Sequence, residues 1–162
     1  MAAALQDFLF VNAMTFKQQI LHRYKELLQD RIDVFQDMIS GLTVDAQNDA
    51  KGSAGDKHET TLSMMHLEQE KLNHKLKQIL EQKSILDKID ALQTHKKVAL
   101  GSVVQANGML LFMSTALPKI TIDNKIIFAL SPQSPLGSKL MGNEANFSFD
   151  MNGKLYVIEN LT

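Results

Sequence analysis

Carboxylates gather in one short segment of this 162-residue chain. Asp45, Asp49, Asp56 and Glu59 lie within 15 residues of one another, among small and polar residues. Carboxylate oxygens are ligands that hard ions such as Mg²⁺ prefer, so these acids, with Asp49 and Asp56 as the candidate metal ligands, could complete the shell of an ion held by a partner. Asp56 and Glu59 also have capping-box spacing, which would place Asp56 at a helix N-cap. Asp45 and Asp49 have an ordinary alternative as loop acids.

Other signs of chemistry are scarce. The chain has no cysteine, which excludes disulfides, zinc–thiolate sites and cysteine nucleophiles. It has no glycine-rich phosphate loop, no nucleophile elbow and no paired histidines at metal spacing. Residues 98–162 hold no histidine and only four acids. We therefore expect no enzyme: no catalytic residue and no cofactor of its own.

The basic residues offer one weak candidate site for nucleic acid. Lys71, Lys75 and Lys77 could contact RNA phosphate, but glutamates surround them, so a mixed solvated face is the simpler interpretation. The net charge of −1 gives no general electrostatic attraction to nucleic acid or membrane. No run approaches the roughly 20 apolar residues of a membrane span. Because the apolar start carries Asp7 where a signal peptide carries base, we expect a cytoplasmic protein without a membrane partner.

The acids and lysines lie in a segment whose apolar residues have helical spacing. Residues 15–97 contain no proline and most of the charges, and apolar side chains recur there every three or four residues. Thr15 is the expected N-cap of the first helix, and Gly41 comes near its expected end. The sequence predicts two helices of about 30 residues, joined by a tip at about 43–57, as an antiparallel coiled-coil hairpin. Residues 1–14 would form a leader or a short helix.

The apolar period changes in residues 98–162. Strands are expected at 98–105, 109–114, 120–123, 126–130, 147–151 and 155–158. Asn107-Gly108 and Asn152-Gly153 are strong signals for tight hairpin turns. Ser134 and Pro135 mark the start of one short helix, with Gly142 beyond its end. The fold class is therefore α+β: a helical hairpin followed by a small domain of antiparallel strands and one helix.

Two runs in this second region resemble the C-terminal domain of the GreA/GreB transcript-cleavage factors. They are Ser131-Pro132-Gln-Ser134-Pro135-Leu136-Gly-Ser-Lys-Leu140-Met-Gly142-Asn143 and Asn152-Gly153-Lys-Leu-Tyr156-Val-Ile158. Gly101-Ser102, within the predicted first strand, resembles the family's glycine–serine strand. The resemblance implies an antiparallel coiled coil at 15–97 followed by an FKBP-like domain at 98–162. The family's glycine–aspartate turn falls at Asn146-Phe147, where asparagine also tolerates a positive φ.

The resemblance also implies a function and a partner. In such factors the globular domain docks on RNA polymerase, so Ser131, Pro132, Ser134, Pro135 and Leu136 become candidate partner-binding residues. The coiled coil enters the secondary channel, where lysines could meet nascent RNA and two tip acids help to hold a second Mg²⁺ in the polymerase active site. The polymerase then cleaves its own backtracked RNA. A factor of this kind is expected to be a monomer.

The tip departs from the family pattern, which leaves alternatives open. The family's glutamate position falls at Ser53 and its aspartate position near Ala50, beside Asp49. Polymerase docking is therefore better supported than cleavage, and the protein could regulate transcription by occupying the channel without cleaving. A second hypothesis is a structural or interaction module that dimerises through its coiled coil. A third, prolyl isomerase activity, follows from the implied fold alone, which is weak evidence for function.

Overall fold

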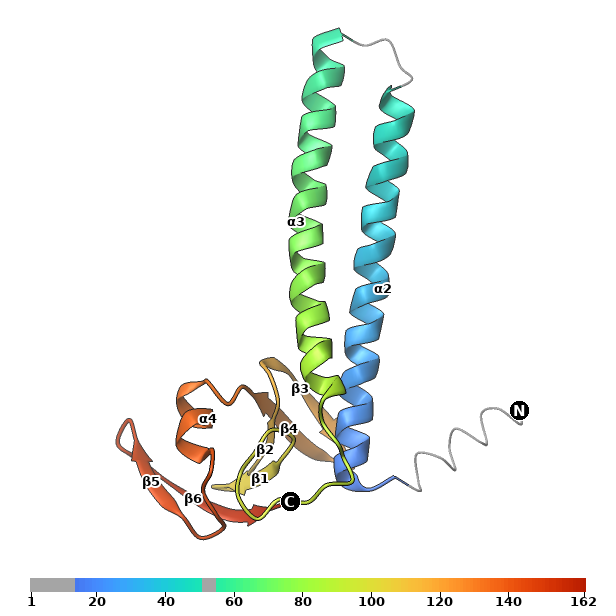
Figure 1. The fold of residues 1–162 in the computed structure, drawn as a ribbon. Helices are drawn as coiled ribbons and strands as arrows, with labels where there is room; N and C mark the ends of the chain where they lie inside the picture. Colours follow the sequence, from blue (N-terminus) through green and yellow to red (C-terminus); the bar gives the residue numbers. More distant parts are fainter. Residues whose placement is uncertain (1–13, 51–54) are drawn as a thin grey trace, which may run out of the picture. The chain divides into compact units, whose positions relative to one another are not determined.

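The computed structural model describes residues 14–50 and 55–162 (Figure 1). The predicted leader at 1–14 lies outside these residues except for Met14. The chain divides into two compact units. The first, here called the sheet unit, holds the chain up to Lys25 together with Ile85–Thr162, and the second, the hairpin unit, is Glu26–Ser84. The boundaries between these units fall inside the helical region, and the sequence-based segments 1–14, 15–97 and 98–162 stay a prediction.

Two long helices account for most of the region predicted to be helical. Helix α2 spans Phe16–Ala50 and helix α3 spans Gly55–Asp87. The predicted N-cap is confirmed: the Gln18 amide donates to Thr15 Oγ1 at 3.2 Å, and the Thr15 amide donates to Gln18 Oε1 at 2.8 Å, forming a capping box. Gly41, expected near the helix end, lies inside α2. The predicted tip at 43–57 is therefore mostly helical, because α2 continues to Ala50 and α3 begins at Gly55.

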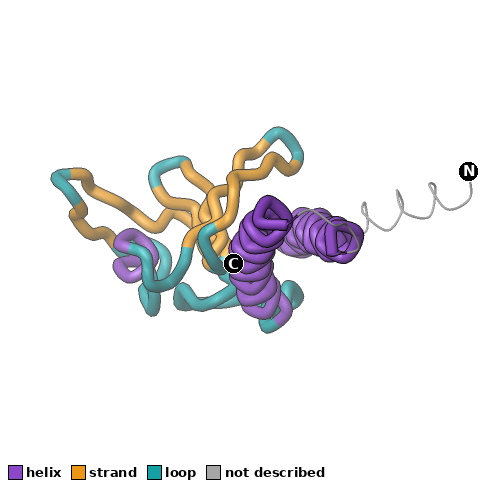
Figure 2. The backbone as a smooth tube through the Cα atoms, turned by 90° about the horizontal axis from the view of Figure 1, so that it is seen from above, coloured by secondary structure: helices purple, strands orange, loops and turns teal. Residues whose placement is uncertain are grey.

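In the hairpin unit, α2 and α3 lie side by side (Figures 1 and 2). The buried side chains recur at helical spacing, as Leu28 and Ile32 on α2 and as Leu72 and Ile79 on α3. The Gln69 amide nitrogen donates to Thr43 Oγ1 at 2.8 Å, which fixes the register of the two helices near their connection. The predicted two-helix arrangement of this unit is confirmed.

Six strands form one sheet in the order β3-β4-β2-β1-β6-β5. Their bounds are Val103–Ala106 (β1), Met109–Met113 (β2), Leu117–Ile122 (β3), Lys125–Leu130 (β4), Ser148–Met151 (β5) and Lys154–Leu161 (β6), with helix α4 at Pro135–Leu140. All neighbouring pairs are antiparallel except β2 and β4, which are parallel. The parallel pair was not expected from sequence, because strand patterns do not show which strands become neighbours.

Tight turns close three hairpins. Both central residues have positive φ at Asn107-Gly108 (50° and 75°), at Asp123-Asn124 (50° and 63°) and at Asn152-Gly153 (53° and 77°). This pattern is that of type I′ turns, whose twist matches the strands they join. Two of these three turns, Asn107-Gly108 and Asn152-Gly153, were predicted.

The first strand starts at Val103 rather than at residue 98, because Gly101 has a φ of 91° and turns the chain.

The central strands are buried on both faces. Val104, Ala106, Leu111 and Met113 point to a core that also contains Leu140 of α4. Their neighbours Val103 and Phe112 alternate to the opposite face and are buried too. Two-sided burial explains why β2 reads as an unbroken apolar run instead of an alternating one.

The first turns of α2 pack on the other face of the sheet, the face that contains Phe112. Tyr24 is fully buried, its ring stacks on Phe112 at 5.9 Å, and its hydroxyl donates to the Pro118 carbonyl at 2.8 Å. Burial raises the pKa of Tyr24 to about 12. The helical spacing of Ile20 and Tyr24 predicted a buried stripe but not the strands that cover it.

Candidate functional site

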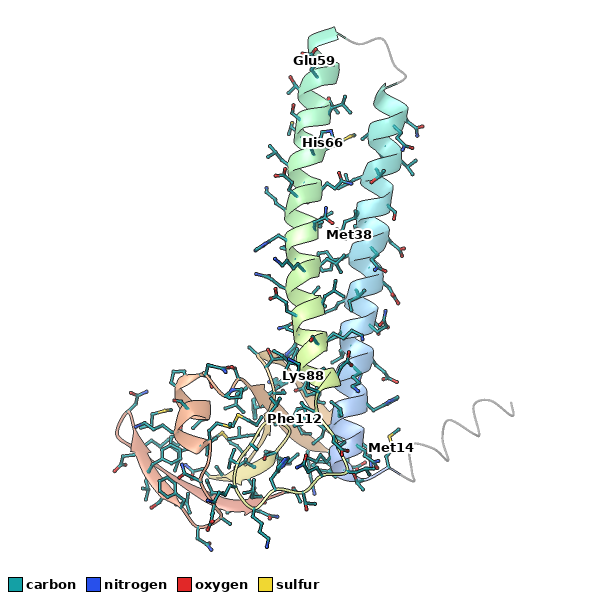
Figure 3. The ribbon with its side chains drawn as sticks, in the orientation of Figure 1. Met14, Met38, Glu59, His66, Lys88 and Phe112 are labelled. Atoms are coloured by element: carbon teal, nitrogen blue, oxygen red, sulfur yellow. The ribbon has the colours of Figure 1, made fainter. Side chains whose placement is uncertain are left out.

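The structure places the acids predicted for the tip on the ends of the two helices. Asp45 is exposed inside α2, and Asp49 belongs to the same helix, so neither is a loop acid. Asp56 lies inside α3, which begins at Gly55, so it is not the N-cap that the capping-box spacing predicted. Glu59 is exposed on α3 (Figure 3). The side chains of Asp49 and Asp56, the two candidate metal ligands, lie outside the described residues.

Two of the four acids have described side chains, Asp45 and Glu59. Asp45 lies five residues before the end of α2, and Glu59 lies four residues after the start of α3. Both side chains are exposed, and both lie beyond the terminal turn, where the helix dipole acts most strongly. Among the described side chains, no three His, Asp or Glu residues gather as a metal site.

The lysines of α3 are not gathered into one patch. Lys71, Lys75 and Lys77 are all exposed. At 100° per residue, Lys71 and Lys75 share a face, whereas Lys77 points about 160° away from Lys75. The outward face that Lys77 occupies also contains Glu70 and Glu81. The geometry is that of a mixed solvated surface, with Lys71 and Lys75 as the one basic pair.

The serines of the motif at 131–137 make hydrogen bonds within the motif itself. Ser134 caps α4: its Oγ accepts from the Gly137 amide at 3.0 Å and donates to the Ser131 carbonyl at 2.7 Å. The Ser131 hydroxyl donates to Gln133 Oε1 at 2.6 Å. The predicted helix with Ser134 as N-cap and Pro135 in its first turn is confirmed. Both serines therefore have a structural role in starting α4.

Close packing explains the rest of the motif. A Cβ atom on Gly137 would lie 2.0 Å from the Ser131 carbonyl oxygen, so only glycine fits. Leu136 packs against the core that contains Leu140 of α4, and Pro132 is half-buried. Pro135 is exposed and is the candidate partner-binding residue most available to a partner. The assignment of these five residues to partner binding remains a prediction.

The turn predicted at Asn146 adopts the expected backbone. Asn146 has a φ of 73°, and its amide donates to the Ile158 carbonyl at 2.7 Å. The departure from glycine at this position therefore leaves the turn intact.

Two features of the sheet unit were missed in the sequence. Lys17 is only 7% exposed, and its spacing from Leu21 and Tyr24 places it on the buried face of α2, a signal that was available. The second is a groove of about 470 Å³ beside the 107–110 turn and strand β4, which includes the exposed side chains of Ile126 and Phe128. None of the groove's residues belongs to the 131–136 motif.

Comparisons add no assignment to this geometry. No helix in the described ranges, 14–50 and 55–162, has both the length and the apolar character needed to cross a bilayer. No protein-family model matches the chain, and no curated protein matches it significantly.

Proposed function

We propose that this protein is a Gre-like transcription elongation factor that binds RNA polymerase and acts as a cofactor of that enzyme in the cytoplasm. The observation that carries the proposal is the helical hairpin with acids at the connected ends of its helices, combined with a following α+β domain in which the two Gre-like runs occur. The family assignment itself rests on the resemblance of residues 131–143 and 152–158.

The dimensions and surface of the hairpin unit support this role. The part of α2 in this unit, residues 26–50, is about 37 Å long at 1.5 Å per residue, and each helix is about 10–12 Å wide. Two helices side by side therefore make a slender rod. Its described surface carries charges of both signs, which suits a rod that enters an aqueous channel lined by nucleic acid and protein. The exposed Lys71 and Lys75 are the contacts to RNA phosphate that we propose.

The acids at the helix ends support a role near a metal ion. Asp45 and Asp49 belong to the C-terminal part of α2, and Asp56 belongs to the first turn of α3. Carboxylates of this kind suit the oxygen shell of Mg²⁺. We propose that Asp49 and Asp56 approach the Mg²⁺ of the polymerase active site and so favour cleavage of backtracked RNA. If they do not reach it, the rod acts as a channel-binding regulator without cleavage.

A backtracked elongation complex tests the proposal. The complex is stalled with the cognate polymerase, Mg²⁺ and end-labelled RNA, and the protein is added alone and then together with an authentic Gre factor. Shortened RNA with the protein alone is the expected result for a cleavage factor. Suppression of the added factor's cleavage, without shortening, would identify a channel-binding antagonist. If the RNA is not shortened and the added factor's cleavage is not suppressed, the result contradicts polymerase binding as the function.

Paired variants locate the activity. Asp49→Ala combined with Asp56→Ala is expected to abolish cleavage while leaving polymerase binding intact. Asp37→Ala combined with Glu68→Ala removes two exposed acids from the same unit and serves as the matched control. Persistent cleavage in the first double variant would show that these acids do not hold the metal.

A second variant tests docking on the polymerase. Pro135→Glu is expected to weaken polymerase binding, and Lys139→Glu, at another exposed residue of α4, is its control.

One observation favours a second candidate, a coiled-coil interaction module. The hairpin unit exposes several large apolar side chains: Val34, Met38, Val44, Met64, Leu67 and Leu80. Such residues would suit contacts with another helical protein or a second copy. Sedimentation velocity separates the two functions, because a Gre-like factor is expected to sediment as a monomer and a self-associating module as a dimer.

A further inference from the structure

Strand β5 forms one edge of the six-stranded sheet (Figure 1). Within the described residues it pairs with β6 alone. An edge strand presents backbone N–H and C=O groups to which another strand can bind. The opposite edge strand, β3, contains Pro118 and Lys119, which disfavour such pairing, whereas β5 contains neither proline nor lysine. The two edges therefore differ, and β5 is the one that can accept a further strand.

The hairpin of β5 and β6 determines which backbone groups point to the open edge. Met151 and Lys154 flank the two-residue turn, so they form a hydrogen-bonded pair. Such pairs alternate along an antiparallel ladder, so Phe149 also directs its N–H and C=O groups to β6. Ser148 and Asp150 direct theirs to the open edge, and both side chains are exposed. Strand β5 thus offers two N–H and two C=O groups to a partner.

The sequence around β5 is palindromic in residue character, since residues 146–152 are Asn-Phe-Ser-Phe-Asp-Met-Asn. Phe149 stands at the centre, and on each side a polar residue, an apolar residue and an asparagine follow. Both asparagines have positive φ and turn the chain, at 73° and 53°. A two-fold axis through the centre of an antiparallel pair brings residues at equal distances from that centre opposite each other. The edge is therefore complementary to a second copy of itself.

We propose that two copies of this chain pair through their β5 strands in antiparallel orientation, in a register centred on Phe149. Ser148 of each copy then lies opposite Asp150 of the other, and each of these two pairs forms two backbone hydrogen bonds. The two Phe149 rings become neighbours, as cross-strand aromatic pairs do in sheets. Each ring already stacks on Tyr156 of its own copy at 5.4 Å. The pair also covers Phe147, which is 42% exposed in the single chain.

The two neighbouring registers that keep the outward groups facing each other are less favourable. A register centred on Asp150 places two aspartates directly opposite each other, and like charges in that position repel. A register centred on Ser148 needs the amide of Asn146, which already donates to the Ile158 carbonyl at 2.7 Å. Only the register centred on Phe149 satisfies both outward residues without opposing like charges.

The short strand makes the expected dimer a weak one. Each copy contributes a four-residue strand, so the interface is smaller than the roughly 1,200 Å² of stable interfaces, and we expect a Kd on the order of 10⁻⁴ M. At about 10 µM the chain is then largely monomeric, as is expected of a Gre-like factor. The proposal does not rest on polymerase binding. It also differs from a coiled-coil dimer, because it uses the sheet unit alone.

NMR spectra of the full chain at increasing dilution test the dimer. Between about 1 mM and about 20 µM, the amide signals of Ser148, Phe149 and Asp150 are expected to shift along a monomer–dimer isotherm. Sedimentation equilibrium over the same range is expected to show the mass approaching that of a dimer. Spectra that do not change with concentration, or that change only in the hairpin unit, would overturn the proposal.

The charge at residue 148 tests the register. Ser148→Lys places a lysine opposite Asp150 twice in the pair and is expected to lower the Kd about fivefold, whereas Ser148→Asp is expected to raise it about fivefold. Thr121→Lys and Thr121→Asp make the same charge changes at an exposed residue of β3 and are expected to leave the Kd unchanged. Equal Kd values for the two Ser148 variants would contradict the register.

An exchange of the two residues gives the closing experiment. Ser148→Asp combined with Asp150→Ser keeps the composition and net charge of the wild type and again places a serine opposite an aspartate. We expect it to restore the wild-type Kd. If the double variant dimerises as weakly as Ser148→Asp alone, then residue 148 does not act through Asp150 of the second copy, and the proposal fails.

Discussion

The two compact units bury their apolar residues in different ways. In the hairpin unit, two helices share one narrow interface, and side chains as large as Val34, Met64 and Leu67 stay exposed. In the sheet unit, the central strands are covered on both faces, by α4 and its neighbours on one side and by Tyr24 of α2 on the other. A two-sided core depends on many distant contacts, whereas the hairpin interface depends on periodic local ones. The units should therefore differ in sensitivity to substitution.

The largest expected effect is at the ring that joins α2 to the sheet. Phe112→Ala removes a fully buried side chain that stacks on Tyr24, and we expect a loss of about 3–5 kcal/mol in the free energy of unfolding. Phe128→Ala in β4 is the control, with a loss below about 1 kcal/mol because Phe128 is 39% exposed. Urea denaturation measures both. Equal losses would mean that this core does not stabilise the unit.

Two glycines give a matched comparison between the units. Gly137→Ala in the sheet unit forces a Cβ against the Ser131 carbonyl, so we expect a loss of about 2 kcal/mol or more. Gly41→Ala in the hairpin unit meets nothing within 4 Å inside α2, so a gain of about 0.5–1 kcal/mol is expected from helix propensity. Thermal unfolding of both variants checks the signs. A stabilised Gly137→Ala protein would refute the close packing of the α4 cap.

The helix interface should respond more weakly and locally. Ile79→Ala removes a buried side chain from the hairpin unit, and a loss of about 2 kcal/mol is expected, at the low end for such changes because few neighbours surround it. Hydrogen exchange should accelerate in residues 59–84 but not in β1 and β2. Acceleration throughout the sheet would show that the two units unfold together. Val34→Ala, at an exposed site, is the control.

The smallest expected effect concerns pH. Burial and, secondarily, the charge of Lys17 hold the pKa of His95 below 6.5, while a hydrogen bond with Thr162 partly opposes them. The unfolded chain then binds this proton more readily, so the stabilising contribution is complete above pH 6.5 and is lost as the pH falls through the window below it. Lys17 lies beside His95, Asp90 acts on Lys17, and the main-chain oxygen of Thr162 lies 3.2 Å from the Lys17 Nζ.

His95→Gln isolates that dependence. Urea denaturation of the wild type and the variant at several pH values between 7.5 and 5 gives the difference in unfolding free energy. We expect the advantage of the wild type to shrink as the pH falls. Parallel stability curves would contradict a lowered pKa of His95 in the folded protein.

The sequence by itself determined the elements whose signals are local. Thr15 and Ser134 cap the helices as their side-chain chemistry predicts, and Asn107-Gly108 and Asn152-Gly153 form the expected turns because few residues tolerate positive φ. The α+β class followed from the change of apolar period. The end of α2 was misplaced, because the helix continues past Gly41 to Ala50, two residues before Gly52. Asp49 and Asp56 could be proposed from residue type, but neither residue's partner could.

Only the tertiary structure decided which surfaces meet. The parallel pairing of β2 with β4, the place of Tyr24 in the core of the sheet unit and the burial of Lys17 all join residues far apart in the chain. Periodicity shows that a face is apolar but not what covers it, because the hydrophobic effect is non-directional. Ser131 and Ser134 were recognised in the sequence as part of a motif, and the structure shows that their hydrogen bonds start helix α4. Local chemistry fixed the elements, and packing between distant segments fixed the boundary of the units and the order of the strands.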